Sequence, residues 1–344
     1  MKKTNLFAVL ALAATPAFLH AQTTNFSDVV GYTTLNVRAK SGSANALSFI
    51  SLNVHRPAAL KSVVGTKSLN GSGQSVVAVS SSLSANQFVG AGNKHYVRVT
   101  SGSNTGLISE ITANDASSIT LADNLDAVLE NGVTQFEVRP FWTLATALPA
   151  GAGLKAGTSA SAADTVTIIN PATGVADSYF YHSSFNQWRK GTTDSSTVAI
   201  HPGSGILVTR KDTTAVAIVI SGEVIGTTIQ ADVAGGTASA SRLTYLANPF
   251  PASSKTLAQS GLYTGSSATG VVGGTSAAAA DTVTIYNPST GVADSYFYHT
   301  SFNQWRKGTT DSSNITIPDG AAVVITRKAN RGAFEWYIPS PVNL

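Results

Sequence analysis

The sequence predicts an all-β protein of two tandem homologous domains, sandwich-like or barrel-like, the first of which carries a small inserted β subdomain. The main observation is a 33-residue block, 164–196, that recurs at 281–313 with 30 of its 33 positions identical. Runs rich in Val, Ile, Thr and Tyr, bounded by turn residues, recur along the chain and favour strands over helices. A stretch near 66–140 has no counterpart in the second half, which indicates an insertion.

The domain boundaries follow from a second, looser repeat. Residues 29–37 and 47–54 predict two strands joined by a Gly/Ser turn, and residues 223–229 and 243–248 predict a similar pair. The repeat unit is therefore larger than the 33-residue block. We expect a first domain at 22–215 and a second, more compact one at 216–344.

The remaining elements are predicted from alternation and turn signals. The inserted stretch contains four short predicted strands, at 95–100, 106–112, 118–121 and 135–139, which suggest a small barrel or sandwich. The Ala/Gly/Ser-rich segments 143–157 and 255–274 predict loops with a helical turn each. The continuous apolar runs 205–211 and 322–328 predict strands covered on both faces, and 334–338 predicts a last strand.

Within the repeated block we expect a strand at 165–169, a turn at 170–174 and a strand at 178–182. Alternation places Phe180 and His182 on one face of the second strand and Tyr179 and Tyr181 on the other.

Several motifs resemble those of a known but functionally uncharacterised family. They are residues 96–102 with Gly106, residues 141–144, and Asp164, Tyr179, Trp188 and Arg210. On these the chain resembles a family of exported, β-rich bacterial proteins of unknown function. The resemblance implies export and a β architecture, and it implies no particular chemistry.

The N-terminus predicts export. Lys2 and Lys3 precede a short apolar run, and residues 19–21 form a small-residue cleavage site, the pattern of a signal peptide at 1–21. The run is too short to cross a bilayer, so we expect no transmembrane segment. The expected location is extracellular or on the outer cell surface, with the periplasm as an alternative. The absence of cysteine excludes disulfides, thiolate metal sites and cysteine nucleophiles.

Composition and motifs argue against nucleic-acid binding and enzymatic chemistry. Without Lys2 and Lys3 the net charge is only +2, and the basic residues are scattered. Established catalytic and phosphate-binding motifs are absent. His182 and His299 each follow an aspartate by five residues, a spacing that could join a metal or acid–base site, but turn and packing roles are favoured. The sequence therefore predicts no catalytic residues, no metal and no cofactor.

The aromatic part of the block is the expected binding surface. Five aromatic residues occur within ten positions of each copy, interleaved with amide and cationic side chains that suit sugar stacking or a protein interface. The alternative is a packed aromatic cluster covered by Arg and Lys stems. Polar loop positions of the block are as identical as its apolar ones, which core packing does not require. The predicted binding residues are Tyr179, Tyr181, Trp188, Arg189, Tyr296, Tyr298, Trp305 and Arg306, with the two tryptophans as exposed anchors.

The function expected from these features is that of a secreted, non-enzymatic structural or adhesive protein. Its expected partners are further copies of itself or glycans of the surface or matrix. A bivalent carbohydrate-binding protein is the alternative, because two equal weak sites give avidity. A polysaccharide-active enzyme is the least favoured hypothesis, since paired carboxylates facing a cleft are not evident.

Overall fold

The computed structural model describes residues 29–169, 175–247, 255–287, 290–318 and 321–338. The expected signal peptide at 1–21 and the expected turn at 170–174 lie outside the described residues. The fold is almost entirely antiparallel β, as the sequence predicts, and only one α-helical turn, α1 (Leu144–Ala147), and two 3₁₀ segments, η1 (Pro149–Gly153) and η2 (Leu257–Gln259), occur among these residues. No helix in the described part of the chain is long and apolar enough to cross a bilayer.

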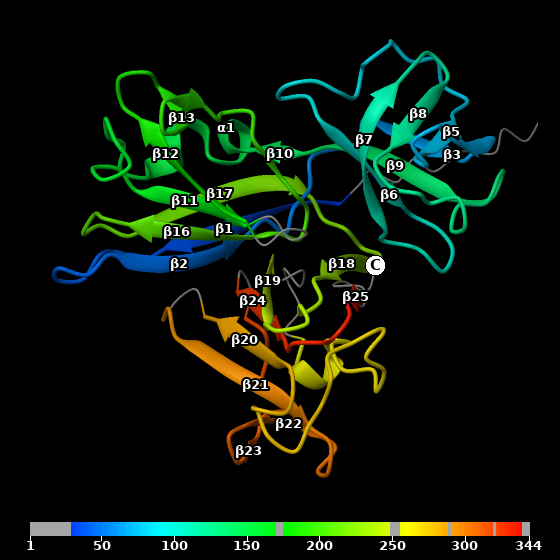
Figure 1. The fold of residues 1–344 in the computed structure, drawn as a ribbon. Coiled ribbons are helices and arrows are strands. Elements are labelled where there is room, and N and C mark those ends of the chain that lie inside the picture. The colour runs from blue at the N-terminus through cyan, green and yellow to red at the C-terminus, as the bar shows by residue number, and fades with distance from the viewer. Residues whose placement is uncertain (1–28, 170–174, 248–254, 288–289, 319–320, 339–344) are drawn as a thin grey trace, which may run out of the picture.

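Two six-stranded sheets repeat the same topology (Figure 1). The first has, in spatial order, β14 (Thr193–Asp194), β13 (Gln187–Lys190), β12 (Ala176–His182), β11 (Thr165–Ile169), β16 (Gly205–Arg210) and β2 (Ala46–Ser51). The second has β23 (Thr310–Asp311), β22 (Gln304–Lys307), β21 (Ala293–His299), β20 (Thr282–Tyr286), β24 (Ala322–Arg327) and β19 (Arg242–Ala247). Even the register is shared, because Val166 lies opposite Tyr179 and Val283 opposite Tyr296.

Each sheet is covered by a two-stranded ribbon. The ribbon β1 (Val30–Val37) with β17 (Val216–Glu223) covers the first sheet, and β18 (Ile229–Val233) with β25 (Phe334–Ile338) covers the second. Because β17 pairs with β1, the strand 216–223 belongs with the first repeat. The expected boundary at 215 would separate β17 from its partner β1. The predicted strand 223–229 is wrong, because most of this segment connects β17 to β18.

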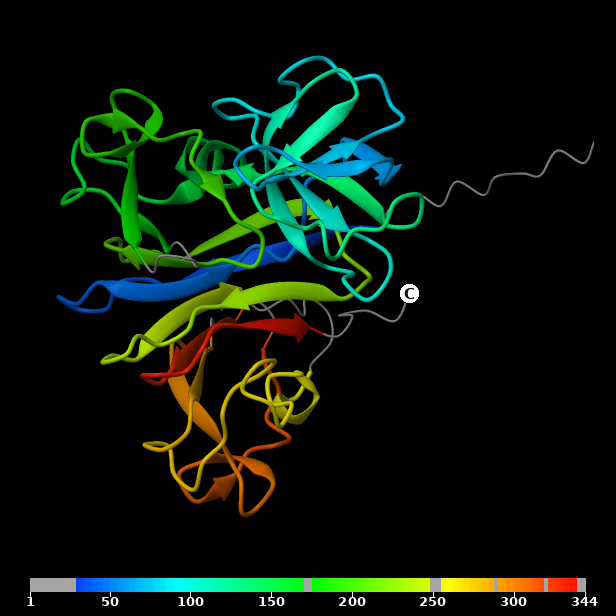
Figure 2. The ribbon, with the colours of Figure 1, turned by 45° about the vertical axis from the view of Figure 1, so that its right-hand side comes forward.

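The inserted stretch forms a separate seven-stranded sheet with its own core. The four predicted strands are present as β6 (His95–Val99), β7 (Ile108–Asn114), β8 (Ser118–Leu121) and β9 (Gln135–Pro140). The sequence missed three short ones, β3 (Leu60–Val63), β4 (Lys67–Leu69) and β5 (Ser75–Ala78), so the sheet begins at residue 60 rather than near 66. The minor ribbon β10 (Trp142–Thr143) with β15 (Ala199–Ile200) follows it. Figure 2 shows this sheet above the β1–β17 ribbon and the second repeat below.

The two repeats contact each other through matching positions. Phe49 of β2 lies opposite Leu207, and Tyr245 of β19 lies opposite Val324, so Phe49 and Tyr245 are equivalent residues of the two repeats. Their rings stack across the junction with centroids 5.8 Å apart and planes 10° apart. A residue that contacts its own equivalent indicates an approximate two-fold relation between repeats.

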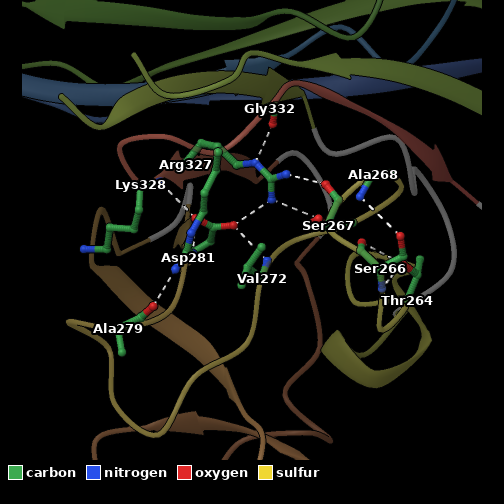
Figure 3. Close-up of polar contacts among 12 residues, drawn as sticks. Thr264, Ser266, Ser267, Ala268, Val272, Ala279, Asp281, Arg327, Lys328 and Gly332 are labelled. Carbon is green, nitrogen blue, oxygen red and sulfur yellow. Dashed lines mark hydrogen bonds and ion pairs between the residues drawn. The ribbon is translucent and has the colours of Figure 1, made fainter. Parts of the chain in front are cut away.

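A duplicated buried ion pair fixes a loop to each sheet. In the second repeat, Asp281 and Arg327 are both fully buried, and Arg327 Nη1 lies 2.7 Å from Asp281 Oδ2 (Figure 3). Asp281 also accepts hydrogen bonds from Arg331 Nη1 and from the backbone N–H groups of Val272 and Lys328, at 2.7, 2.8 and 2.9 Å. Asp164 and Arg210 form the corresponding pair in the first repeat. Four donors on one carboxylate offset the cost of burying its charge.

A second buried charge network joins the inserted sheet to the first repeat. Glu137 of β9 contacts Arg98 and Arg139, at 3.2 and 2.6 Å, and Arg139 also lies 2.6 Å from the Glu223 carboxylate at the end of β17. Nearby, burial and the charges of Arg98 and Arg139 lower the pKa of His55 to about 3. These groups are enclosed and satisfied within the protein, so their role is structural.

Candidate functional site

The repeated block folds as a β-hairpin in each half. Strands β12 and β13 are joined by a four-residue turn, 183–186, and β21 and β22 by the turn 300–303. The last turn residues, Asn186 and Asn303, adopt left-handed backbone angles, with φ of 51° and 50°. Asparagine tolerates this conformation better than most residues, which explains its place in the turn.

One face of each hairpin is core, and this corrects the predicted site. Trp188 is 1% exposed and Trp305 2% exposed, so the hypothesis that they are exposed anchors is wrong. Trp188 Nε1 donates a hydrogen bond to the Leu148 carbonyl oxygen at 3.0 Å. The face is covered because segment 143–157, expected to be mainly loop, folds as α1 and η1 and contributes Leu144 and Leu148 to the same core.

The predicted tyrosines share the faces of the tryptophans. Tyr179 and Tyr296 are buried, and burial followed by the charge of the neighbouring Asp177 or Asp294 raises the pKa of each phenol. Tyr181 is half-buried and lies edge-on to Trp188, with ring centroids 5.7 Å apart. In the second repeat the remaining tyrosine, Tyr298, lies edge-on to Trp305 at 5.8 Å and stacks on Tyr263. Six of the eight predicted binding residues, the four tyrosines and the two tryptophans, therefore pack within the protein and do not form an exposed surface.

The turn at the tip of each hairpin exposes a phenylalanine, which contacts an arginine and a histidine of the flanking strands. The histidine is buried in the first repeat and half-buried in the second, and the strand phenylalanines Phe180 and Phe297 are buried. Phe185 in the turn is 60% exposed, and the Arg189 guanidinium carbon lies 4.4 Å from its ring centroid. The His182 ring centroid is 4.6 Å from that of Phe185. We call these three residues, and their counterparts in the second repeat, the hairpin-tip patches.

The second patch reproduces the first closely. Phe302 is 59% exposed, Arg306 lies 4.5 Å from its ring centroid, and the His299 ring centroid is 4.6 Å away. A guanidinium over a ring is attracted by the π-electrons of its face, so the arginine holds the phenylalanine at the surface. The closely similar geometry follows from the nearly identical sequences of the two hairpins, which differ only at Ser183 and Thr300.

Each patch contains an arginine that is held by groups of its own hairpin. Arg189 and Arg306 each donate from Nη2 to a turn carbonyl, of Thr192 and Thr309 respectively. Their Nε atoms have no hydrogen-bond partner within the described part of the chain. The adjacent lysines, Lys190 and Lys307, are neutralised by ion pairs with Asp177 and Asp294. Asp194 and Asp311 lie opposite Arg189 and Arg306 in the neighbouring strands, so the charge of each arginine is partly compensated.

The alternative of a metal or acid–base pair between His182 and Asp177 finds no support in the geometry. Residues five apart on a strand point to opposite faces, and Asp177 is paired with Lys190. His182 Nδ1 accepts hydrogen bonds from the backbone N–H groups of Ser184 and Phe185, at 3.2 and 3.4 Å. Among the residues that the structure describes, no group of three or more His, Asp or Glu side chains could hold a metal ion.

Of the predicted binding residues, only Arg189 and Arg306 lie on the patches. Phe185 and Phe302 were not predicted as binding residues, although their positions in the sequence indicate exposure. Residues 183–186 and 300–303 form tight turns between two paired strands, and the tip of such a hairpin projects from the sheet rather than into the core.

Comparison with known proteins gives no match to a family model, to a curated protein or to a solved structure. The resemblance to an exported β-rich family is therefore not supported by a family match.

Proposed function

We propose that the protein is an exported, non-enzymatic structural or adhesive protein that assembles or binds through its two hairpin-tip patches. The observation that carries the proposal is the paired exposure of Phe185 and Phe302, each under an arginine at 4.4–4.5 Å. Exposed aromatic and arginine side chains are the residue types that dominate protein interfaces. The expected signal peptide at 1–21 supports export.

The placement of the patches suits a linking role. The β12–β13 hairpin lies at the upper left of the molecule in Figure 1 and the β21–β22 hairpin at its lower end. Two equal sites at separate places on one chain can engage two partners, or one multivalent partner with avidity. A bivalent carbohydrate-binding protein remains the alternative, favoured by the exposed Phe rings beside arginine guanidinium groups.

The test compares single and double Phe185→Ala and Phe302→Ala variants of the chain from residue 22. Each single change is expected to weaken self-association or glycan binding roughly 30-fold, from about 2 kcal/mol for an aromatic anchor. Sedimentation velocity and a glycan array distinguish the two kinds of partner. We expect folding to be retained, because surface substitutions rarely change stability by more than about 0.5 kcal/mol.

Val175→Ala and Val292→Ala provide a matched control. These valines are also duplicated and exposed, and they precede strands β12 and β21, at the end away from the hairpin tips. The control variants should associate and bind as the unchanged protein does. A double phenylalanine variant that self-associates and binds glycans normally would show that the patches are not recognition surfaces.

A further inference from the structure

A recess on the second repeat has the properties that a hairpin-tip patch requires of a partner. It is a cavity of about 590 Å³ between β18, β25, the start of β19 and the 268–269 loop, and its lining includes Asp232, Glu335, Arg242, Phe334 and Tyr337. Cavities of roughly 300–1,000 Å³ accommodate ligands of a few side chains in size. We call it the acidic recess.

The charges of the recess point to a cationic occupant. Asp232 and Glu335 lie directly opposite each other in the β18–β25 ribbon. Like charges at opposed positions destabilise a strand pair, and a bound cation would relieve that repulsion. Partial burial, and after it the charge of the nearby Asp123, raises the pKa of Asp232.

The surroundings keep the region acidic overall. Arg242 is the only cation among the described residues that line the recess. An adjoining cavity of about 370 Å³ shares Asp232 and adds Glu110 and Asp123. Glu110 is paired with Lys94 at 2.6 Å. Among the described residues, four carboxylates and one guanidinium, that of Arg242, line the two cavities.

The recess is already formed without an occupant. Its 268–269 loop follows Ser267 and precedes Gly270, and both carbonyl oxygens accept hydrogen bonds from the buried Arg327 (Figure 3). Arg327 is in turn held by Asp281. A rigid, preformed site avoids the ordering cost that a flexible loop would incur on binding.

We propose that the acidic recess of one copy receives the hairpin-tip patch of a second copy, with the phenylalanine in the cavity and the arginine against Asp232 and Glu335. The inference rests on the proposed function, in which the patches are the contact surfaces. The patch supplies an exposed ring and an arginine guanidinium, and the recess supplies volume, an exposed Tyr337 ring and two carboxylates beside one guanidinium.

The occupant must come from another copy. Both Phe185 and Phe302 are about 60% exposed, so neither fills the recess of its own chain. A contact between two different surfaces of identical chains does not close on itself unless the rotation between copies closes a ring. Each chain offers two patches and one recess, so the assembly formed is an open chain that can branch.

The test mixes two variants that are each defective in one surface. Glu335→Lys removes the acidic character of the recess and converts the repulsive pair with Asp232 into an attractive one, so folding is expected to be kept. Phe185→Ala with Phe302→Ala removes both patches. Glu130→Lys, at an exposed acidic position in the inserted sheet, is the control for a charge reversal of the same size.

Sedimentation velocity gives a stoichiometric readout. Each variant alone should remain monomeric where the unchanged protein and Glu130→Lys associate. The mixture should form a complex of one Glu335→Lys chain, which has two patches, with two chains of the patch variant, which have one recess each. The Kd for self-association of Glu335→Lys should rise roughly 30-fold or more.

Two outcomes would overturn the inference. If Glu335→Lys associates as the unchanged protein does, or if the mixture stays monomeric, the recess is not the acceptor. The double phenylalanine variant then separates the two proposals. If it loses self-association or glycan binding, the proposed function stands and only the recess assignment fails. If that variant behaves normally, both fail.

Discussion

Replacement of Asp281 by asparagine is expected to destabilise the second repeat strongly. The carboxylate is fully buried and accepts from two arginines and two backbone N–H groups, at 2.7–2.9 Å. Asparagine keeps the shape but loses the charge, and it places an NH₂ group against at least one donor. Breaking a buried ion pair by removing one partner costs about 3–5 kcal/mol, because the other charge stays buried.

The consequence should be visible in thermal unfolding. For a unit of 150–250 residues each kcal/mol shifts Tm by roughly 2–4 °C, so Asp281→Asn should lower Tm by about 10 °C. Asp294→Asn is the matched control. Asp294 pairs with Lys307 at the surface, where the two side chains are 35% and 53% exposed, and such a pair contributes less than about 1 kcal/mol.

Calorimetry of the two variants beside the unchanged protein checks the reasoning. Burial decides how much each ion pair contributes to the free energy of unfolding. If Asp281→Asn and Asp294→Asn shift Tm by equally small amounts, burial does not decide the contribution of the ion pair.

Three further predictions follow from burial, titration and the N-terminus. Trp188→Ala and Trp305→Ala should each lower the free energy of unfolding by about 3–5 kcal/mol in urea titrations, and a loss below about 1 kcal/mol would contradict their core assignment. The pKa of His55 is about 3 in the folded protein, against an ordinary value of 6.5. Between these pH values the unfolded chain binds a proton at His55 and the folded protein does not. The free energy of unfolding should therefore fall as the pH is lowered through this range, by up to about 1.4 kcal/mol per pH unit. His55→Asn should flatten that part of the pH profile of unfolding, and an unchanged slope would exclude the assignment. Mass spectrometry of the exported protein should find Gln22 at its N-terminus, and a chain that begins at Met1 would disprove cleavage.

The sequence alone determined the fold class and most of the strands. Alternation and turn residues are local signals, so the strand 334–338 and four of the seven strands of the inserted sheet could be predicted within a few residues. The 117-residue offset between the repeated blocks predicted the repeated topology in the same way. Strand 216–223 was missed as part of the first repeat because its partner, β1, is distant in sequence.

Which hairpin face is core was decided only by the tertiary structure. Phe180 and His182 are buried as well, at 4% and 9% exposed. Alternation separates them from Tyr179, Tyr181 and Trp188, but it does not say which set another element will pack against. That depends on α1 and η1 folding back over the tryptophan, a contact set by Leu144 and Leu148 some 40 positions away in the chain. The acidic recess likewise exists only because β18 and β25, distant in sequence, place Asp232 opposite Glu335. Local patterns fix local geometry, whereas covering and opposing surfaces depend on long-range packing that no short pattern encodes.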